Sequence, residues 1–469
     1  MLVCLTKRKV STKTQREEEE GEGEVLPHLY SLEGETFLAK NMARIALRSE
    51  LNLFDPGMYQ TSVIDSSYQE FLPLQTLTQN GPIEFFVAPS GVDYLDPSEI
   101  HLHVKLKVVK VNGQDYAAAS TSFNTAPECN LLHNLWSNIK CELNDTELSS
   151  SSFTYPYRAY LTNLLNYTKQ TAEGHLASQF WIRDQAGALN STTSESFIKR
   201  KDKVENSKVI ELYGRPLLDI AEQPLLILPG VSLKLTLTSS KDAFCLRGTT
   251  AKVHLTHVSL FVRKVKVNPS IHAAHLSQLN KSNAKYRINR KVVKVFTVPQ
   301  GSQSISKDNI FLGQLPKKLT VGFVSSKSFH GDFSVSPFDF KNYQLNNLSL
   351  RVGGRSIPAK PLEPNFDEDC YFRSYLQTLA AQGVDAADHT IDLSYEDFKS
   401  GFTLFVFDLT PDQEAACNEH DQPPQHGSLR LEARFGLTLP ETVNIVVLGE
   451  FNNLIEITAR RHVICDFGA

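Results

Sequence analysis

Alternation of apolar and polar residues is the strongest structural signal along this chain. Between Ile100 and Val108 the even positions are apolar, whereas the odd positions are His101, His103, Lys105 and Lys107. Successive side chains of a strand point to opposite faces, so this pattern predicts a strand with one buried and one exposed face. Similar apolar runs predict further strands at 81–87, 209–212, 225–228, 231–237, 253–267, 292–298, 319–324, 402–407, 429–435, 443–448 and 454–457.

Dipeptides that favour tight hairpin turns lie between several of the predicted strands. Asn144-Asp145 separates 139–143 from 146–148, and Gly353-Gly354 separates 348–352 from 355–357. Asn112-Gly113 is a third such signal, directly after the alternating strand. The polar stretch 166–208 has only a weak period, and we expect a long excursion between strands there.

A short helix follows the hairpin in each half of the chain. In 154–165 the residue Pro156 suits the first helical turn, and the apolar residues after it share one face. The order aromatic, Arg, small, Tyr, Leu then recurs 215 positions downstream, in 372–379. The repeated residues are Tyr157, Arg158, Tyr160 and Leu161 in the first copy and Phe372, Arg373, Tyr375 and Leu376 in the second. We interpret this motif as scaffold, with Arg158 and Arg373 as alternative subunit contacts.

The repeated hairpin and helix indicate a duplicated architecture. Many short strands with long loops are typical of β-sandwiches, and 469 residues are enough for two domains. We therefore predict an all-β protein of two tandem eight-stranded jelly rolls, with short helices in inter-strand loops. The predicted divisions are a flexible N-terminal arm at 1–45, a first jelly roll at 46–270, a linker at 271–289 and a second jelly roll at 290–469.

Composition restricts the environment and the class of the protein. A net charge of −4 argues against a wholly polybasic nucleic-acid binder, and no apolar run approaches the roughly 20 residues of a membrane helix. The seven cysteines are scattered, without a Cys-x-x-Cys pair. We expect reduced, mostly buried thiols in a cytosolic or nuclear setting. The acidic run at 17–24 lies in a terminal segment with little that could enter a core.

Signals for enzymatic chemistry are weak throughout the chain. The sequence has no Gly-x-x-x-x-Gly-Lys loop, no His-Glu-x-x-His and no Gly-x-Ser-x-Gly elbow. Paired histidines on predicted strands, His101 with His103 and His254 with His257, could bind a metal, but four isolated histidines are weak evidence for a metal site. Glu363 with Asp367–Asp369 could hold Ca²⁺, although a solvated loop before a helix explains these charges better. We predict no catalytic residue, metal or cofactor.

Four ordered blocks resemble a known family. They are Ser-Glu-Leu-Asn-Leu-Phe at 49–54, Gly-Pro-Ile-Glu-Phe-Phe-Val at 81–87, Leu-Trp-Ser-Asn-Ile-Lys-Cys-Glu-Leu-Asn at 135–144 and Tyr-Pro-Tyr-Arg-Ala-Tyr-Leu at 155–161. These blocks resemble the major capsid protein of Polinton (Maverick) elements and adintovirus-like viruses, and the resemblance runs through most of 45–467. The acidic run at 17–24 departs from that pattern.

The resemblance implies a structural role. Members of this family have the double jelly-roll fold, and three copies form a pseudo-hexameric capsomer that tiles an icosahedral shell. The implied partners are further copies of the chain and a minor (penton) capsid protein. The implied location is the virion capsid, with synthesis in the cytoplasm and assembly in the nucleus or cytoplasm of the host cell.

A basic stretch is the clearest charge feature. Between Asp242 and Asp308 the chain has twelve Lys or Arg residues and no acidic one. The stripe that we predict comprises Arg263, Lys264, Lys266, Lys285, Arg287, Arg290, Lys291 and Lys294. It could contact packaged DNA, an acidic internal protein or a neighbouring subunit from the inner face of the capsomer. The alternative is a solvated strand face and a polar linker.

Two other classes of protein remain as alternatives. A receptor- or carbohydrate-binding jelly roll, such as a spike or lectin-like module, would need a compact aromatic and polar cluster on loops. A jelly-roll enzyme of the cupin kind would need a converging His/Glu metal set. The sequence favours the capsid subunit over both.

Overall fold

The computed structural model describes residues 59–77, 81–117, 123–148, 153–385, 387, 390–417 and 420–467. The chain divides into two compact units, Met1–Gln60 and Thr61–Ala469. The architecture described below is that of the second unit. The predicted arm at 1–45 lies outside the described residues.

The first jelly roll consists of two four-stranded antiparallel sheets. One has the order β1-β10-β3-β7, with bounds Val63–Phe71, Lys252–Val267, Tyr94–Val109 and Ile210–Gly214. The other has the order β2-β8-β5-β6, with bounds Ile83–Val87, Leu233–Ser239, Trp136–Leu143 and Thr146–Glu147. A separate short pair joins β4 (Thr125–Pro127) to β9 (Leu246–Gly248).

The second jelly roll repeats this topology. One sheet has the order β11-β18-β13-β16, with bounds Ala284–Val298, Val443–Ile457, Lys318–Ser325 and Leu404–Asp408, and β19 (Val463–Cys465) pairs with β18. The other has the order β12-β17-β14-β15, with bounds Ser304–Lys307, Leu429–Phe435, Leu345–Val352 and Arg355–Leu362. Strand for strand, the two rolls match in chain order and in sheet order. The predicted all-β double jelly roll is confirmed.

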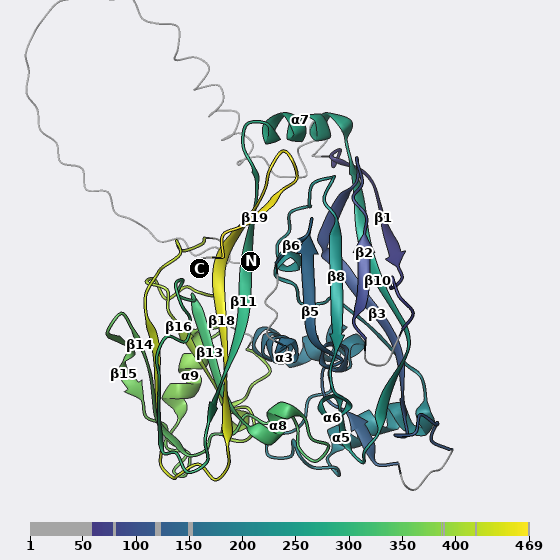
Figure 1. The fold of residues 1–469 in the computed structure, drawn as a ribbon. Coiled ribbons are helices and arrows are strands. Elements are labelled where there is room, and N and C mark those ends of the chain that lie inside the picture. The colour runs from purple at the N-terminus through teal and green to yellow at the C-terminus, as the bar shows by residue number, and fades with distance from the viewer. Residues whose placement is uncertain are drawn as a thin grey trace, which may run out of the picture. The chain divides into compact units, whose positions relative to one another are not determined.

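Short helices occupy the connections between strands. Their bounds are Leu131–Asn134 (α2), Tyr155–Asn166 (α3), Lys169–Glu173 (α4), Glu195–Val204 (α5), Asp242–Cys245 (α6), Pro269–Leu279 (α7), Ser326–His330 (α8), Phe372–Ala380 (α9) and Tyr395–Lys399 (α10), with 3-10 turns His175–Gln179 (η2), Glu205–Ser207 (η3) and Asp219–Glu222 (η4). The helices α3 and α9 follow equivalent hairpins, β5-β6 and β14-β15. Figure 1 shows α7 between the end of β10 and the start of β11. Most of α7 and the first residues of β11 therefore occupy the segment expected as linker.

Each roll has its own hydrophobic core, and each core takes side chains from the other roll. The alternating strand β3 buries Leu102, Val104 and Leu106, as its pattern predicts. The core around it also includes Tyr286 and Ile288 from β11 of the second roll. In return, the second core includes a set of residues from α3, namely Tyr157, Tyr160, Leu161, Leu164 and Leu165. The two rolls thus share a packed junction.

Several sequence predictions were wrong in detail. The segment 225–228 forms no strand; only Ile227 bridges to Leu95, because Pro224 and Pro229 on either side lack the N–H of a ladder. The runs 443–448 and 454–457 are one continuous strand, β18, because β11 pairs along its whole length. The stretch 166–208, by contrast, is the expected long excursion between strands, from β6 to β7, and it contains helices α4 and α5.

Two further strand assignments also changed. The strand β1 was missed, because its sequence, VIDSSYQEF, is polar and nearly all of it is exposed. Asn112-Gly113 does form a turn, in which the N–H of Gly113 donates to the carbonyl of Lys110. However, this turn does not close a hairpin in the described part of the chain: β3 pairs with β10 and β7, which lie much later in the sequence, and not with the next strand, β4.

The cysteines match the expectation of buried thiols only in part. None of the six cysteines in the described ranges forms a disulfide; Cys129, Cys141 and Cys245 are buried, whereas Cys370 is exposed. The expectation of buried thiols thus holds better in the first roll than in the second.

Among the helices that the structure describes, none is long and apolar enough to cross a bilayer.

A buried ion pair in the second core predicts acid sensitivity. Glu450 on β18 lies 3.2 Å from the Lys318 ammonium on β13, and both side chains are under 10% exposed. Burial would raise the pKa of Glu450, but Lys318 and Lys291 outweigh it and lower that pKa from 4.5 to about 2. The stabilisation is therefore fully present above pH 4.5 and is lost as pH falls towards 2, by about 3 kcal/mol in all.

Glu450→Gln should reduce the pH dependence of the unfolding free energy between pH 4.5 and 3 by up to about 1.4 kcal/mol per pH unit. Denaturant unfolding at several pH values measures this slope. Glu456→Gln, on the same strand beside the exposed Lys285, is the control. Equal slopes for the wild type and Glu450→Gln would refute the assignment.

Candidate functional site

The helix α3 lies in the junction between the two rolls. Tyr157 donates its hydroxyl proton to the carbonyl of Pro337 at 2.9 Å, and its ring stacks on Phe329. Tyr160 stacks on Phe338, with ring centroids 4.0 Å apart and planes within 3°. Burial raises the pKa of Tyr157 above its ordinary value, so this tyrosine is a neutral hydrogen-bond donor. An aromatic face that the sequence placed on the first roll therefore completes the core of the second.

A buried charge network holds the same helix. The Arg158 guanidinium lies 2.6 Å from Asp219 and 3.7 Å from Glu222, both on η4. Lys291, from β11 of the second roll, reaches Glu222 at 2.9 Å, and its backbone N–H donates to Asp219. Burial raises the pKa of Asp219 above its ordinary value, against the opposing effect of Arg158. The two rolls are thus joined by paired charges as well as by rings.

The equivalent helix of the second roll presents the same residue types to solvent. In α3, Tyr157 is 2% and Leu161 0% exposed, whereas their counterparts Phe372 and Leu376 in α9 are 59% and 50% exposed. Arg373 is also exposed and donates to the carbonyls of Lys360 and Pro361. Contiguous exposed apolar side chains mark interaction surfaces. The surface formed by Phe372, Arg373 and Leu376 is called the α9 surface below.

The first roll has an uncovered counterpart as well. By topology β1 corresponds to β11, whose Tyr286 and Ile288 are buried in the first core. The strand β1 is exposed along most of its length, and its Ile64 and Tyr68 are 63% and 52% exposed. The chain therefore uses one pair of surfaces internally and leaves the equivalent pair open, one surface on each roll.

The predicted basic stripe is divided between the rolls. Arg263, Lys264 and Lys266 lie on β10, whereas Lys285, Arg287, Arg290, Lys291 and Lys294 lie on β11. Within this set the exposed side chains are Lys266, Lys285 and Arg287. Arg263 pairs with Asp96 at 3.4 Å. The structure therefore places these residues on two strands, one in each roll.

Two members of that set have partners inside the chain. Lys291 is 6% exposed and bonded to Glu222, so it is part of the junction and is not available to a polyanion. Arg290 is half-buried within the second roll, where it donates to Asn453 and its guanidinium lies 4.8 Å from the centroid of the Phe451 ring.

A second buried charge cluster was missed by the sequence analysis. Arg200 on α5 lies 2.8 Å from Asp184, and Arg247 on β9 lies 3.2 Å from Asp184 and 3.4 Å from Glu128. Ser336 of the second roll donates to Glu128. All four charged side chains are under 5% exposed. They come from four distant segments, so no local pattern could have revealed them.

Histidines on the first roll do have acidic partners. His103 Nε2 lies 2.7 Å from Glu211 on β7, and His257 Nε2 lies 3.7 Å from Glu70 on β1. Both carboxylates lie far from these histidines along the chain, so the sequence did not indicate them as partners. By contrast, the residues considered for Ca²⁺ bond elsewhere: Asp369 pairs with Lys399, and Asp367 accepts from Gln344.

The fold is the double jelly roll of viral major capsid proteins. Solved structures similar to this chain include a chain of the Sputnik virophage, with a TM-score of 0.60 and 10% identity over 90% of this chain and 92% of that one. The major capsid protein of mavirus has a TM-score of 0.51 and 11% identity over 96% and 97%. That of Faustovirus has a TM-score of 0.54 and 11% identity over 88% and 93%.

Sequence comparisons are less informative about function. An uncharacterized protein of Caenorhabditis elegans is 23% identical over 427 residues, which cover 88% of this chain and 99% of that protein. No protein-family model matches the chain. The structural similarities therefore identify the fold, and the role of this chain has to be argued from its own surfaces.

Proposed function

We propose that this chain is a major capsid protein, a structural subunit without catalytic activity. In this proposal three copies form a pseudo-hexameric ring, and rings tile the icosahedral shell of a Polinton-type virus or transposon. The observation that carries it is the contrast between α3, covered by the second roll, and the exposed α9 surface. The solved structures of the same fold, which include mavirus and Faustovirus major capsid proteins, support the class.

The duplication supplies the geometry of the ring. Inside one chain, the first roll receives side chains from β11 of the second roll, and α3 is covered in the process. The same contact made between chains would cover the α9 surface of one copy with the first roll, around β1, of the next. Such head-to-tail contacts close into rings when the rotation allows it. The family resemblance supports a ring of three copies.

The assignment of segments and partners follows this proposal. The first roll is assigned to 46–270 and the arm to 1–45; α7 and the turn after it connect the rolls, and the second roll begins with β11 at Ala284. The partners are other copies of the chain and a minor penton protein, within the virion capsid, after assembly in the nucleus or cytoplasm of a host cell.

The decisive experiment expresses the chain alone, measures its mass by light scattering, and images it by electron microscopy. Trimers of about three chain masses, and particles under assembly conditions, are expected. A stable monomer with no capsomer under any assembly condition would contradict the proposal.

The exposed basic residues remain candidates for contact with packaged DNA or an internal protein. Lys285→Glu combined with Arg287→Glu should leave trimers intact and reduce nucleic-acid content or particle yield, because polyanion binding depends on such cations. Particle yield and the absorbance ratio at 260 and 280 nm report the effect. Unchanged particles would remove this role, and Lys203→Glu combined with Lys208→Glu, two exposed lysines outside the stripe, is the matched control.

The alternative of a receptor- or carbohydrate-binding jelly roll has one feature to examine. A cleft beside the junction is lined by rings and amides, including Tyr167, His175, Tyr213 and Gln223. Saturable binding of a glycan array to a stable monomer, lost on Tyr213→Ala, would favour that function over the capsid subunit.

A further inference from the structure

The outer face of the β1-β10-β3-β7 sheet carries a cluster of rings that the proposed function does not require. His101 stacks on Tyr213 with centroids 5.0 Å apart, and Tyr68, His103 and Phe261 contact these rings at centroid separations of 6.0 to 6.1 Å. A sheet face that is exposed to water ordinarily carries isolated polar side chains. The density of imidazoles and carboxylates here calls for a chemical explanation.

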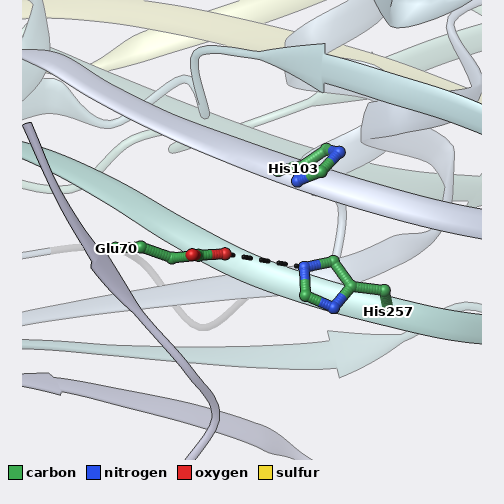
Figure 2. Close-up of side chains that lie close together, drawn as sticks. All are labelled: Glu70, His103 and His257. Atoms are coloured by element: carbon green, nitrogen blue, oxygen red, sulfur yellow. Dashed lines mark ion pairs between the residues drawn. The ribbon is translucent and has the colours of Figure 1, made fainter.

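Three side chains of this face converge from three adjacent strands. Glu70 comes from β1, His257 from β10 and His103 from β3, and Figure 2 shows Glu70 reaching towards His257, with His103 beside it. One ligand atom from each lies within 4.8 Å of the other two. The His103 and His257 rings have centroids 5.3 Å apart. Register fixes this arrangement, since β10 pairs with both neighbours along its length.

Two imidazoles and one carboxylate are the donor set of open zinc sites, in which water or another ligand completes the tetrahedron. Bonds of about 2.0–2.1 Å place tetrahedral donors roughly 3.3 Å apart. The present separations exceed this by at most about 1.5 Å. The side chains of His257 and Glu70 are 35% and 44% exposed, so rotation about their own torsions can close the difference while the strands stay in place.

A second carboxylate supports one of these donors. Glu211 accepts from His103 Nε2 at 2.7 Å and also lies 3.5 Å from the Lys105 ammonium. Carboxylates bonded to a metal-binding histidine fix its ring and strengthen its basicity, and their loss typically weakens metal binding 10- to 100-fold. The site thus has its outer support already in place.

We propose that Glu70, His103 and His257 bind a divalent transition metal of the zinc class, with Glu211 as the positioning residue for His103. The site lies on the first roll, with Glu70 exposed and both histidines half-buried, and it does not depend on whether the chain forms capsids.

The test titrates the purified full chain with Zn²⁺ by calorimetry and with Co²⁺ by visible absorption. A second group, Glu414, Cys417 and His420, lies in a loop of the second roll and could also take zinc. All titrations are therefore made in a Cys417→Ser, His420→Ala background, which also removes thiolate-to-cobalt bands. One Zn²⁺ per chain is expected, with the cobalt spectrum of a tetrahedral nitrogen and oxygen site.

Substitutions then assign the ligands. His103→Ala and His257→Ala should abolish the site, Glu70→Gln should weaken it at least tenfold, and Glu211→Gln should weaken it 10- to 100-fold without changing the stoichiometry. The exposed His330→Ala is the matched control and should bind like the parent. Circular dichroism checks that each variant is folded, and His103→Gln replaces His103→Ala if the latter is not.

Repeating the titration on the chain with Phe372→Ser and Leu376→Ser separates metal binding from oligomerisation, because those changes lie in the other roll. Absence of micromolar binding in the parent, or unchanged binding in both histidine variants, would overturn the proposal. Zn²⁺ binding retained by the Phe372→Ser, Leu376→Ser variant would support the metal site even if that variant forms no capsomer.

Discussion

Replacing Phe372 and Leu376 together by serine is expected to yield a folded monomer that no longer forms capsomers. Each side chain is about half exposed in the single chain, so a neighbouring copy would cover the remaining half. Full burial of such a side chain stabilises by about 1.5–3 kcal/mol, and the half still to be buried on both residues gives about 1.5–3 kcal/mol per contact. That corresponds to roughly a 10- to 150-fold weaker contact, repeated around the ring.

Light scattering and sedimentation velocity measure this loss, and thermal unfolding verifies that the variant is folded. Leu437→Ser is the matched control, because Leu437 is 69% exposed in the same roll but lies outside α9. It should assemble normally. Assembly of the double variant at the wild-type concentration would mean that α9 is not a subunit contact, whichever other surface forms the ring.

The same substitution in the first copy of the motif should act on folding instead. Leu161 is fully buried, so Leu161→Ser removes a core side chain and leaves a hydroxyl in an apolar site. Leu161 and Leu376 are equivalent positions of the repeated motif. A folding defect at Leu161 and an assembly defect at Leu376 would show that the second roll covers the first copy of the motif, whereas a neighbouring chain covers the second copy.

Arg158→Ala is expected to destabilise the chain by about 3–5 kcal/mol, because it leaves the buried Asp219 without its closest counter-charge. Burial already raises the pKa of Asp219 with Arg158 present, and without it that pKa should rise further. The folded state then binds a proton that the unfolded state releases. The destabilisation is therefore complete above the raised pKa of the folded state, and it fades as pH falls to the ordinary aspartate value.

Urea unfolding at pH 7.5 and 5 measures both the loss and its pH dependence. Arg373→Ala provides the control, because this exposed arginine bonds only to backbone carbonyls of its own roll among the contacts described. It should lower the unfolding free energy by no more than about 1 kcal/mol. An Arg158→Ala variant within 1 kcal/mol of the wild type would show that the pair does not hold the junction.

Local patterns predicted most of the strands but missed exposed ones such as β1. The segment at 100–108 alternates because one face of β3 is buried, and periodicity detects this directly. The strand β1 has no buried face, so its sequence carries no apolar period. Missing β1 also meant missing Glu70, the carboxylate that makes the two histidines a plausible metal site.

The motif shared by α3 and α9 marks the limit of sequence interpretation. Its repetition determined that the chain is duplicated, because equal spacing of a hairpin and a helix requires only the order of residues. It could not tell that Tyr157 is buried by the second roll and Phe372 is exposed, since burial depends on which surface another part of the chain covers.

The sequence by itself thus determined the all-β class, the duplication and the positions of α3 and α9, which arise from local periodicity, turn residues and helix-start signals. The tertiary structure alone decided which copy of each surface is covered, where Arg158, Asp219, Glu222 and Lys291 meet, and that Glu70 joins His103 and His257. Contacts between residues tens to hundreds of positions apart follow from strand register and roll packing, and neither leaves a local pattern in the sequence.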